Sequence, residues 1–267
     1  MIELNDELLV KMNRSSSKGN QLKWCINNIW YKADNNGYEG LSEYVISRLL
    51  KHSSLNHDEY IDYSLDQVKY KNTLLNVCKS NNFLSNGDSI ITIARLLSTY
   101  DSNFNNIYDS LVTVKEKAQY LIDVVISLTG LNDFGEYLYK ISVVDGLFLN
   151  DDRHLHNIAV IQKNSGVFDY CPIFDNGAAL LSDTKLEYPF TENTIDLIKS
   201  VKSKTFDIDF MDVIDVLENS YSTKIYFSFT EKDIDKILGD VTIYKQEEVK
   251  RVKQVLLYQR NKYHHFF

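Results

Sequence analysis

NDDRHLHN, residues Asn150–Asn157, is the stretch from which the fold and the chemistry of this 267-residue sequence are best inferred. A second polar stretch follows it, IFDNG, residues Ile173–Gly177. Mg²⁺ prefers hard oxygen ligands, and usually one or two protein groups hold it together with phosphate and water. The side chains of Asn157 and Asp175 carry such oxygens. The two stretches therefore indicate a site for Mg²⁺ and a nucleoside triphosphate.

The spacing of these residues fits phosphoryl transfer. The reaction needs a carboxylate that receives or orients the proton of the attacking hydroxyl, and Asp152 is the natural candidate. Asp152 lies five residues before Asn157, so one loop can direct both side chains to the same place. The β-favouring runs Ile158–Gln162 and Val167–Phe174 then predict a hairpin. That hairpin would return Asp175 to the same edge.

The elements around these stretches predict two unequal lobes. Residues 1–85 contain short β-favouring runs, among them Gln21–Ile26 and Ile29–Ala33, and one early helix. Residues 86–267 show mainly helical periodicity. We therefore expect an α+β fold with a small β-rich first lobe and a larger, mainly helical second lobe. Further expected elements are the strands Asp58–Asp66 and Lys69–Lys79 and the helix Ser89–Tyr100.

The two polar stretches resemble those of the HipA-like kinases. The pattern is D-R-H-x-x-N, here Asp152–Asn157, and after a hairpin D-x-G, here Asp175–Gly177; the phosphatidylinositol kinases share the Asp-x-His order. Upstream, SSSKGNQLKW at Ser15–Trp24 and WYKAD at Trp30–Asp34 resemble the phosphate-covering loop and the lysine strand of this group. The resemblance covers most of the chain. It implies a bilobal protein-kinase-like fold that encloses ATP in a cleft.

The resemblance also implies roles for the residues of the two stretches. Asp152 would be the catalytic aspartate, and Asn157 and Asp175 would bind Mg²⁺. His154 is grouped with Asp152 in the catalytic loop, which it would brace through hydrogen bonds. Arg153 would be a second brace of the same loop.

Lys32 would contact the α- and β-phosphates of ATP. In kinases such a lysine is held by a glutamate on a helix. Glu43 fits this role because its helix follows the lysine strand, and Glu39 on the same helix is the alternative. Taken alone, a lysine at a strand edge is usually a solvated charge. The nucleotide role of Lys32 therefore depends on its combination with Glu43 and the downstream loop.

The loop SSSKG would cover the phosphates, with Ser17, Lys18 and Gly19 as its contacts. It contains a single glycine, so this assignment follows from the resemblance and not from a glycine-rich motif. Serines of this loop are autophosphorylated in some HipA-like kinases, and Ser15, Ser16 and Ser17 occupy the comparable stretch. Added phosphate charge would repel the nucleotide, which predicts self-inhibition. The alternative is a flexible turn without such a role.

The composition argues against several classes of protein. The net charge of −8 disfavours non-specific nucleic-acid binding, and we expect no direct nucleic-acid contact. Three widely spaced cysteines, Cys25, Cys78 and Cys171, predict neither a disulfide framework nor a metal cluster and fit a reducing cytoplasm. Apolar stretches fall short of the roughly 20 residues of a membrane span, so a soluble protein is expected.

We therefore expect an ATP- and Mg²⁺-dependent phosphotransferase. The resemblance favours a bacterial serine/threonine protein kinase that autophosphorylates and acts as a toxin or effector. Its partners would be a protein with a Ser or Thr acceptor and an antitoxin or regulatory protein. Two alternatives stay open, namely a nucleotide-binding pseudokinase or interaction module, and a lipid kinase of the phosphoinositide type.

Two further interpretations of these residues do not involve a kinase. His154 and His156 could bind zinc in a hydrolase, but no third histidine or cysteine lies at ligand spacing. Alternatively, Asp152 and Asn157 could only cap a loop and satisfy a turn. The later Asp175 makes this second interpretation the weaker one.

Overall fold

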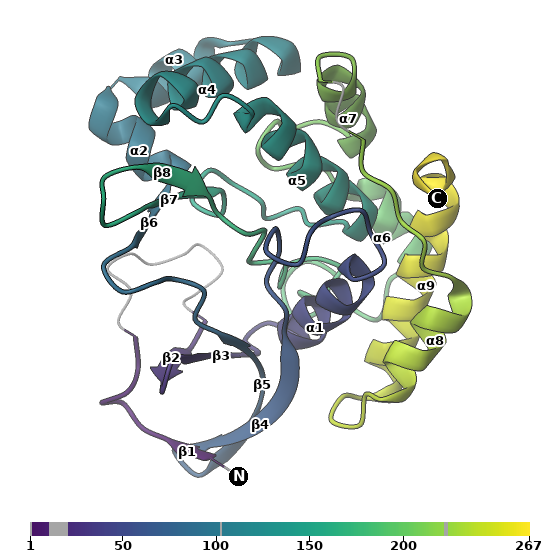
Figure 1. Ribbon diagram of the computed structural model, residues 1–267. Coiled ribbons are helices and arrows are strands. Elements are labelled where there is room, and N and C mark those ends of the chain that lie inside the picture. The colour runs from purple at the N-terminus through teal and green to yellow at the C-terminus, as the bar shows by residue number, and fades with distance from the viewer. Residues whose placement is uncertain (1, 11–20, 102, 222–223) are drawn as a thin grey trace. The chain divides into compact units, whose positions relative to one another are not determined.

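The computed structural model describes residues 2–10, 21–101, 103–221 and 224–267. It contains both strands and helices, which are labelled in Figure 1. The chain forms two compact units. The first unit comprises Met1–Phe83, Asn176–Ser200 and Tyr226–Phe267, and the second unit comprises Leu84–Asp175 and Val201–Ile225. The expected α+β class is confirmed.

A five-stranded sheet in the order β1-β4-β5-β3-β2 forms the β-rich part of the first unit. β1 pairs with β4 in parallel, and the other neighbours are antiparallel. The expected hairpin between β2 and β3 is confirmed, because Asn27 and Asn28 have φ angles of 50° and 62° and form its two-residue turn. The strands are β1 (Ile2–Leu4), β2 (Lys23–Ile26), β3 (Ile29–Ala33), β4 (Ser64–Tyr70) and β5 (Thr73–Asn81). Their buried side chains, Leu4, Trp24, Tyr31, Ala33, Val68 and Val77, form one core cluster.

The second hairpin of this sheet begins later than the sequence predicts. In place of the strands Asp58–Asp66 and Lys69–Lys79, β4 and β5 meet at Lys71–Asn72, where the φ angles are 48° and 63°. The prediction was wrong because the β-favouring residues Tyr60, Ile61 and Tyr63 are buried without belonging to a strand, and they precede β4. A two-residue turn of this kind needs positive φ at both positions, and here a lysine occupies one of them.

The helices of the first unit come from three parts of the chain. α1 (Glu39–Leu50) packs against β3, β4, β5 and α8, and α9 packs against α8 and α6. The other helices of this unit are α6 (Thr194–Ser200), α8 (Glu231–Gly239), α9 (Gln246–Lys262) and the 3₁₀ helix η1 (His264–Phe266). The sequence suggested a single lobe from residue 86 to 267. The contacts of α8 with α1 instead group the C-terminal helices with the sheet.

The second unit contains the remaining helices and a three-stranded sheet in the order β6-β7-β8. α5 packs against α4 and α7, and α4 ends at Gly130, whose φ of 74° is the predicted left-handed stop. The elements are α2 (Ile93–Tyr100), α3 (Phe104–Ser110), α4 (Val114–Thr129), α5 (Phe134–Phe148), α7 (Phe210–Glu218), β6 (Ser89–Thr92), β7 (Ala159–Gln162) and β8 (Phe168–Tyr170). The helix predicted for Ser89–Tyr100 is therefore wrong in its first turn. Its β-branched start pairs with β7, and the Thr92 side chain then caps α2.

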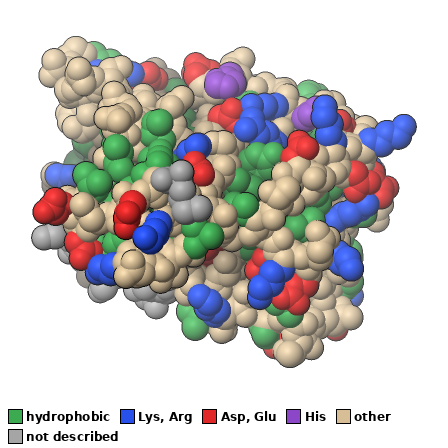
Figure 2. Space-filling model, turned by 90° about the horizontal axis from the view of Figure 1, so that it is seen from below, with side chains coloured by type: hydrophobic (Ala, Val, Ile, Leu, Met, Phe, Trp, Pro, Cys, Tyr) green, Lys and Arg blue, Asp and Glu red, His purple; other side chains and the backbone are tan. Residues whose placement is uncertain are grey.

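Two general properties of the described residues concern their helices and their charged side chains. In the part of the chain that the structure describes, no helix is both long and apolar enough to cross a membrane. On the face seen in Figure 2, acidic and basic side chains are interspersed.

Candidate active site

The predicted catalytic loop leaves α5 through a left-handed residue. Leu149 has φ 57° and ψ 47° and is buried, so a bulky side chain occupies a position that helices usually give to glycine. The backbone N–H of Asn150 donates to the Asp145 carbonyl at 2.9 Å and closes the end of the helix. The chain is thereby turned sharply into the loop that begins at Asn150.

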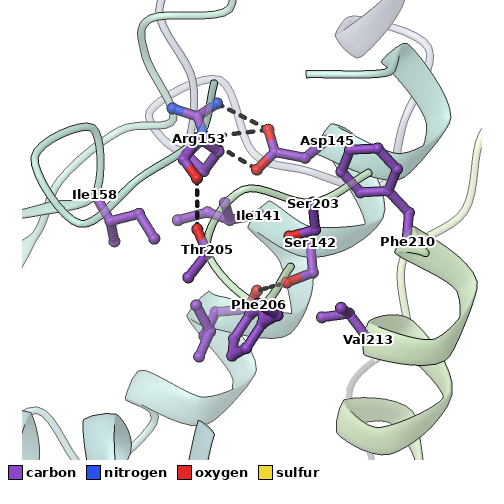
Figure 3. A pocket seen from close by; sticks show the side chains of 11 residues that line it. Ile141, Ser142, Asp145, Arg153, Ile158, Ser203, Thr205, Phe206, Phe210 and Val213 are labelled. Atoms are coloured by element: carbon purple, nitrogen blue, oxygen red, sulfur yellow. Dashed lines mark hydrogen bonds and ion pairs between the residues drawn. The ribbon is translucent and has the colours of Figure 1, made fainter. Parts of the chain in front are cut away.

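A buried ion pair lies beneath this loop (Figure 3). The Arg153 guanidinium donates through Nε to both carboxylate oxygens of Asp145, at 3.1 and 3.0 Å, and through Nη2 to Oδ1 at 3.0 Å. The two side chains are only 4% and 5% exposed. Burial raises the pKa of the Asp145 carboxyl, even though the adjacent Arg153 guanidinium lowers it. Such a pair resists separation because either partner left alone would be an uncompensated buried charge.

The same guanidinium joins the two polar stretches that the sequence singled out. Arg153 Nη1 donates to the carbonyl oxygen of Asn157 at 3.0 Å and to that of Phe174 at 2.5 Å. Asn150 Nδ2 adds a bond to the carbonyl oxygen of Asp175 at 3.3 Å. Both candidate metal-binding residues therefore lie on backbone segments that one buried network holds side by side. Asp175 itself has a φ of 60°, a conformation that aspartate tolerates.

Asp152 lies in the same loop and contacts a lysine that is distant in sequence. Its Oδ1 atom forms a very short ion pair with Lys204 Nζ, and the two side chains are 19% and 45% exposed. The backbone of Asp152 is also fixed, because Asn157 Nδ2 donates to its carbonyl oxygen at 3.1 Å. Thr205 donates its hydroxyl to the Arg153 carbonyl oxygen at 2.5 Å. The loop is thus held from two sides.

In the first unit, Lys32 and Glu43 form the pair that the sequence suggested. Lys32 Nζ donates to Glu43 Oε1 at 2.7 Å, and the side chains are 12% and 1% exposed. The lysine also lies 5.3 Å from the centre of the Tyr63 ring. Glu43 Oε2 accepts from the backbone N–H of Asn176, which follows Asp175 in the chain, at 3.0 Å. The glutamate therefore binds both the lysine strand and Asn176 of the second polar stretch.

Glu39, the alternative partner of Lys32, has a different role. Its carboxylate accepts from the backbone N–H groups of Asn35, Asn36 and Gly37 at 3.2, 2.6 and 3.1 Å. It therefore caps the turn before α1 and leaves Glu43 as the glutamate of the pair.

The resemblance implies that Arg153 and His154 both brace this loop through hydrogen bonds. Arg153 makes such bonds, but the Nδ1 atom of His154 makes none with the described residues. The Nδ1 atom of His154 is buried and makes no hydrogen bond to any described residue. Its backbone carbonyl accepts from Asn157 N at 2.7 Å, and its ring lies edge-on to His156 at 5.5 Å. Ser15, Ser16, Ser17, Lys18 and Gly19 lie outside the described residues.

A small cavity borders the buried ion pair. Asp145, Arg153, Ser203, Thr205 and Phe206 are among the residues that line it (Figure 3). Its volume of about 10 Å³ suits one water molecule and is far too small for a nucleotide. The described residues contain no group of three His, Cys, Asp or Glu side chains that could hold a metal ion. A magnesium site completed by an amide and phosphate would not form such a group.

Sequence reasoning missed the residues that hold this site together. Asp145 was recognisable as a charge within the otherwise apolar run SVVDGLF of α5, where a buried carboxylate needs a partner. Asn150 opens the quoted stretch but had no assigned role. Lys204 and Thr205 carried no signal, because they lie 52 residues from the side chain and carbonyl that they contact.

Comparison with solved structures shows a kinase-like fold. The crystal structure of a Helicobacter pylori proinflammatory kinase, CtkA, is similar to this chain with a TM-score of 0.58. The similarity covers 98% of this chain and 94% of that chain, at 16% sequence identity. At this identity the likeness shows the fold and not the roles of residues. The chain matches no family model and no curated protein.

Proposed function

We propose that the chain is an ATP- and Mg²⁺-dependent phosphotransferase. The observation that carries this proposal is the Arg153 network, which holds the backbones of Asn157 and Asp175 together beside Asp152 in the second unit. The Lys32–Glu43 pair of the first unit supports it independently. The kinase-like fold is consistent with both.

The donor set of the second unit fits Mg²⁺. Asn157 Nδ2 donates to the Asp152 carbonyl oxygen, which leaves the amide oxygen of Asn157 without a hydrogen bond to the described residues. An amide oxygen and the Asp175 carboxylate are hard ligands, and the remaining positions would be filled by phosphate and water. Asn157 and Asp175 would hold the ion, which would supply positive charge to offset the negative charge that develops during transfer.

Asp152 is suited to receive the proton of an acceptor hydroxyl. Its Oδ1 atom is engaged by Lys204, and its Oδ2 atom makes no hydrogen bond to any described residue. The side chain is 19% exposed, so a hydroxyl can reach it from solvent. The carboxylate therefore orients the hydroxyl and accepts its proton as the new bond to phosphorus forms.

Lys32 is suited to bind the phosphates of the nucleotide. Its ammonium donates to the buried Glu43 carboxylate at 2.7 Å and to the Tyr63 hydroxyl at 3.4 Å, and these contacts fix its position. A positioned cation of this kind binds the α- and β-phosphates in kinases. Asp152, Asn157, Asp175 and Lys32 are thus the residues that we assign to the reaction, and His154 belongs to the same loop.

The acceptor that we propose is a Ser or Thr hydroxyl of a protein, and the enzyme itself is one acceptor. This part of the proposal follows from the resemblance of D-R-H-x-x-N and D-x-G to the HipA-like kinases. The same resemblance supports a bacterial, cytoplasmic enzyme with a toxin or effector role and a regulatory partner such as an antitoxin.

Transfer of radioactive γ-phosphate from ATP tests the proposal. The purified chain should label itself or a generic protein acceptor when Mg²⁺ is present and should not do so with EDTA. Asp152→Ala and Asp175→Ala should each lower the rate by at least about 100-fold. Asp109→Ala, on an exposed residue of α3, is the matched control and should be as active as wild type.

The same assay separates the alternatives. Nucleotide binding without transfer would favour the pseudokinase or interaction module. Transfer to phosphoinositide vesicles, with none to protein, would favour the lipid kinase. Full activity of both aspartate variants would contradict the assignment of the site.

A further inference from the structure

Lys204 belongs to a loop that is fixed against the catalytic loop. Ser203 and Ile208 form an isolated antiparallel bridge, with Ser203 N donating to Ile208 O at 2.9 Å, and Asp207 N donates to Ser203 O at 2.7 Å. This tight loop lies in the second unit, before α7. The position of the Lys204 backbone is therefore set by the loop's own hydrogen bonds.

Thr205 attaches this loop to the rest of the second unit. Its hydroxyl donates to the Arg153 carbonyl oxygen at 2.5 Å, and its own carbonyl oxygen accepts from the Tyr108 hydroxyl at 2.9 Å. Phe206 is buried next to it and lines the small cavity seen in Figure 3. Two consecutive residues, Lys204 and Thr205, thus contact two consecutive residues of the catalytic loop.

The Lys204 ammonium keeps spare donors at the place where the reaction would occur. An ammonium has three N–H donors, and Asp152 is the partner of Lys204 among the described residues. The side chain is 45% exposed, so the other donors can reach a ligand from solvent. A hydroxyl held by Asp152 must lie in line with the phosphorus that it attacks. A cation bonded to Asp152 consequently lies close to the transferred phosphoryl group.

We propose that Lys204 is a further catalytic residue, which contacts the terminal phosphoryl group of the bound nucleoside triphosphate. This inference rests on the proposed phosphotransfer. In that step the acceptor oxygen bonds to the γ-phosphorus while the bond to the β,γ-bridging oxygen breaks. The hydroxyl proton passes to Asp152, and the nucleoside diphosphate leaves with the bonding electron pair. Lys204 offsets the negative charge of the oxygens on the transferred group.

The proposal is tested by Lys204→Met, with Lys202→Met as the matched control. Lys202 is exposed in the same loop and undergoes the same loss of charge and hydrogen-bond donors. The turnover number of Lys204→Met should fall about 10- to 100-fold, and that of Lys202→Met should not change. Lys204→Arg keeps the positive charge and should recover part of the rate. Both Met variants should melt within a few degrees of wild type, because an exposed ion pair contributes little stability.

Binding supplies a readout that does not depend on turnover. Calorimetry with Mg²⁺ should show that Lys204→Met weakens binding of the β,γ-imido analogue of ATP about 3- to 10-fold and leaves ADP binding unchanged. A lysine that only orders the loop would affect both nucleotides equally. That equal effect, or a turnover number like that of Lys202→Met, would overturn the proposal for Lys204 alone. A wild-type chain that transfers no phosphate would instead overturn the proposed function, and this inference with it.

Discussion

Replacement of Arg153 by Met should loosen the second unit strongly. The change leaves the Asp145 carboxylate, only 5% exposed, without its counter-charge, and it removes the donor shared by the carbonyl oxygens of Asn157 and Phe174. Removing one partner of a buried ion pair costs about 3–5 kcal/mol. At about 1.4 kcal/mol for each factor of ten, protected amides of α5 should exchange roughly 100- to 4,000-fold faster.

Hydrogen exchange followed by mass spectrometry measures this effect within one unit. Peptides from α5 and from the catalytic loop should lose protection, and peptides from the β2–β3 hairpin of the first unit serve as the internal reference. The Asp145→Leu/Arg153→Met double variant removes both buried charges and should recover stability to within about 1–2 kcal/mol of wild type. It should still be inactive, because the two carbonyl oxygens lack their shared donor.

Either of two results would refute this reasoning. Unchanged exchange of α5 in Arg153→Met would show that the pair does not stabilise the unit. Full phosphotransfer by the stable double variant would show that the Arg153 hydrogen bonds are not needed to hold the site.

Three further outcomes are expected. The free energy of unfolding of the first unit should fall as the pH rises from 5 to 8. Burial raises the pKa of Asp34 to about 8. The folded state therefore keeps a proton that the unfolded state loses above about pH 4, so folding becomes less favourable as the pH rises through this range. Urea midpoints from tryptophan fluorescence should show this fall in wild type and much less of it in Asp34→Asn; a wild-type midpoint that does not move with pH would contradict it. Gly37→Ala should cost about 2–4 kcal/mol in the same assay because its Cβ would lie 1.9 Å from a backbone carbonyl oxygen, whereas Gly239→Ala, with no described atom within 4 Å, should be neutral or stabilising. Lys32→Met should weaken MgATP binding about 10- to 100-fold by calorimetry, against no change for the exposed Lys69→Met, and equal affinities would exclude the lysine from the nucleotide site.

Local sequence signals predicted the structure correctly where a residue type has one strong conformational preference. Consecutive asparagines predicted the turn at Asn27–Asn28, and Gly130 predicted the end of α4. The order of a lysine strand and a following helix predicted the Lys32–Glu43 pair. In each case the residue's own conformational preference or its near neighbours in the chain carry the information.

Contacts between distant residues could not be predicted in this way. Helical periodicity identifies α8 and α9 but not the neighbour on which they pack, so their grouping with the sheet was missed. The turn at Lys71–Asn72 was missed because lysine is an unusual residue at positive φ. The lysine that contacts Asp152 is separated from it by 52 residues, and no spacing rule connects the two.

A crystal structure with Mn²⁺ and the β,γ-imido analogue of ATP tests the central claim most directly, because the anomalous signal of manganese locates the metal without ambiguity. The proposed function predicts manganese bound to the side chains of Asn157 and Asp175 and to the nucleotide phosphates, with Lys32 at the α- and β-phosphates. A metal bound elsewhere, or a nucleotide that contacts none of these three residues, would contradict it.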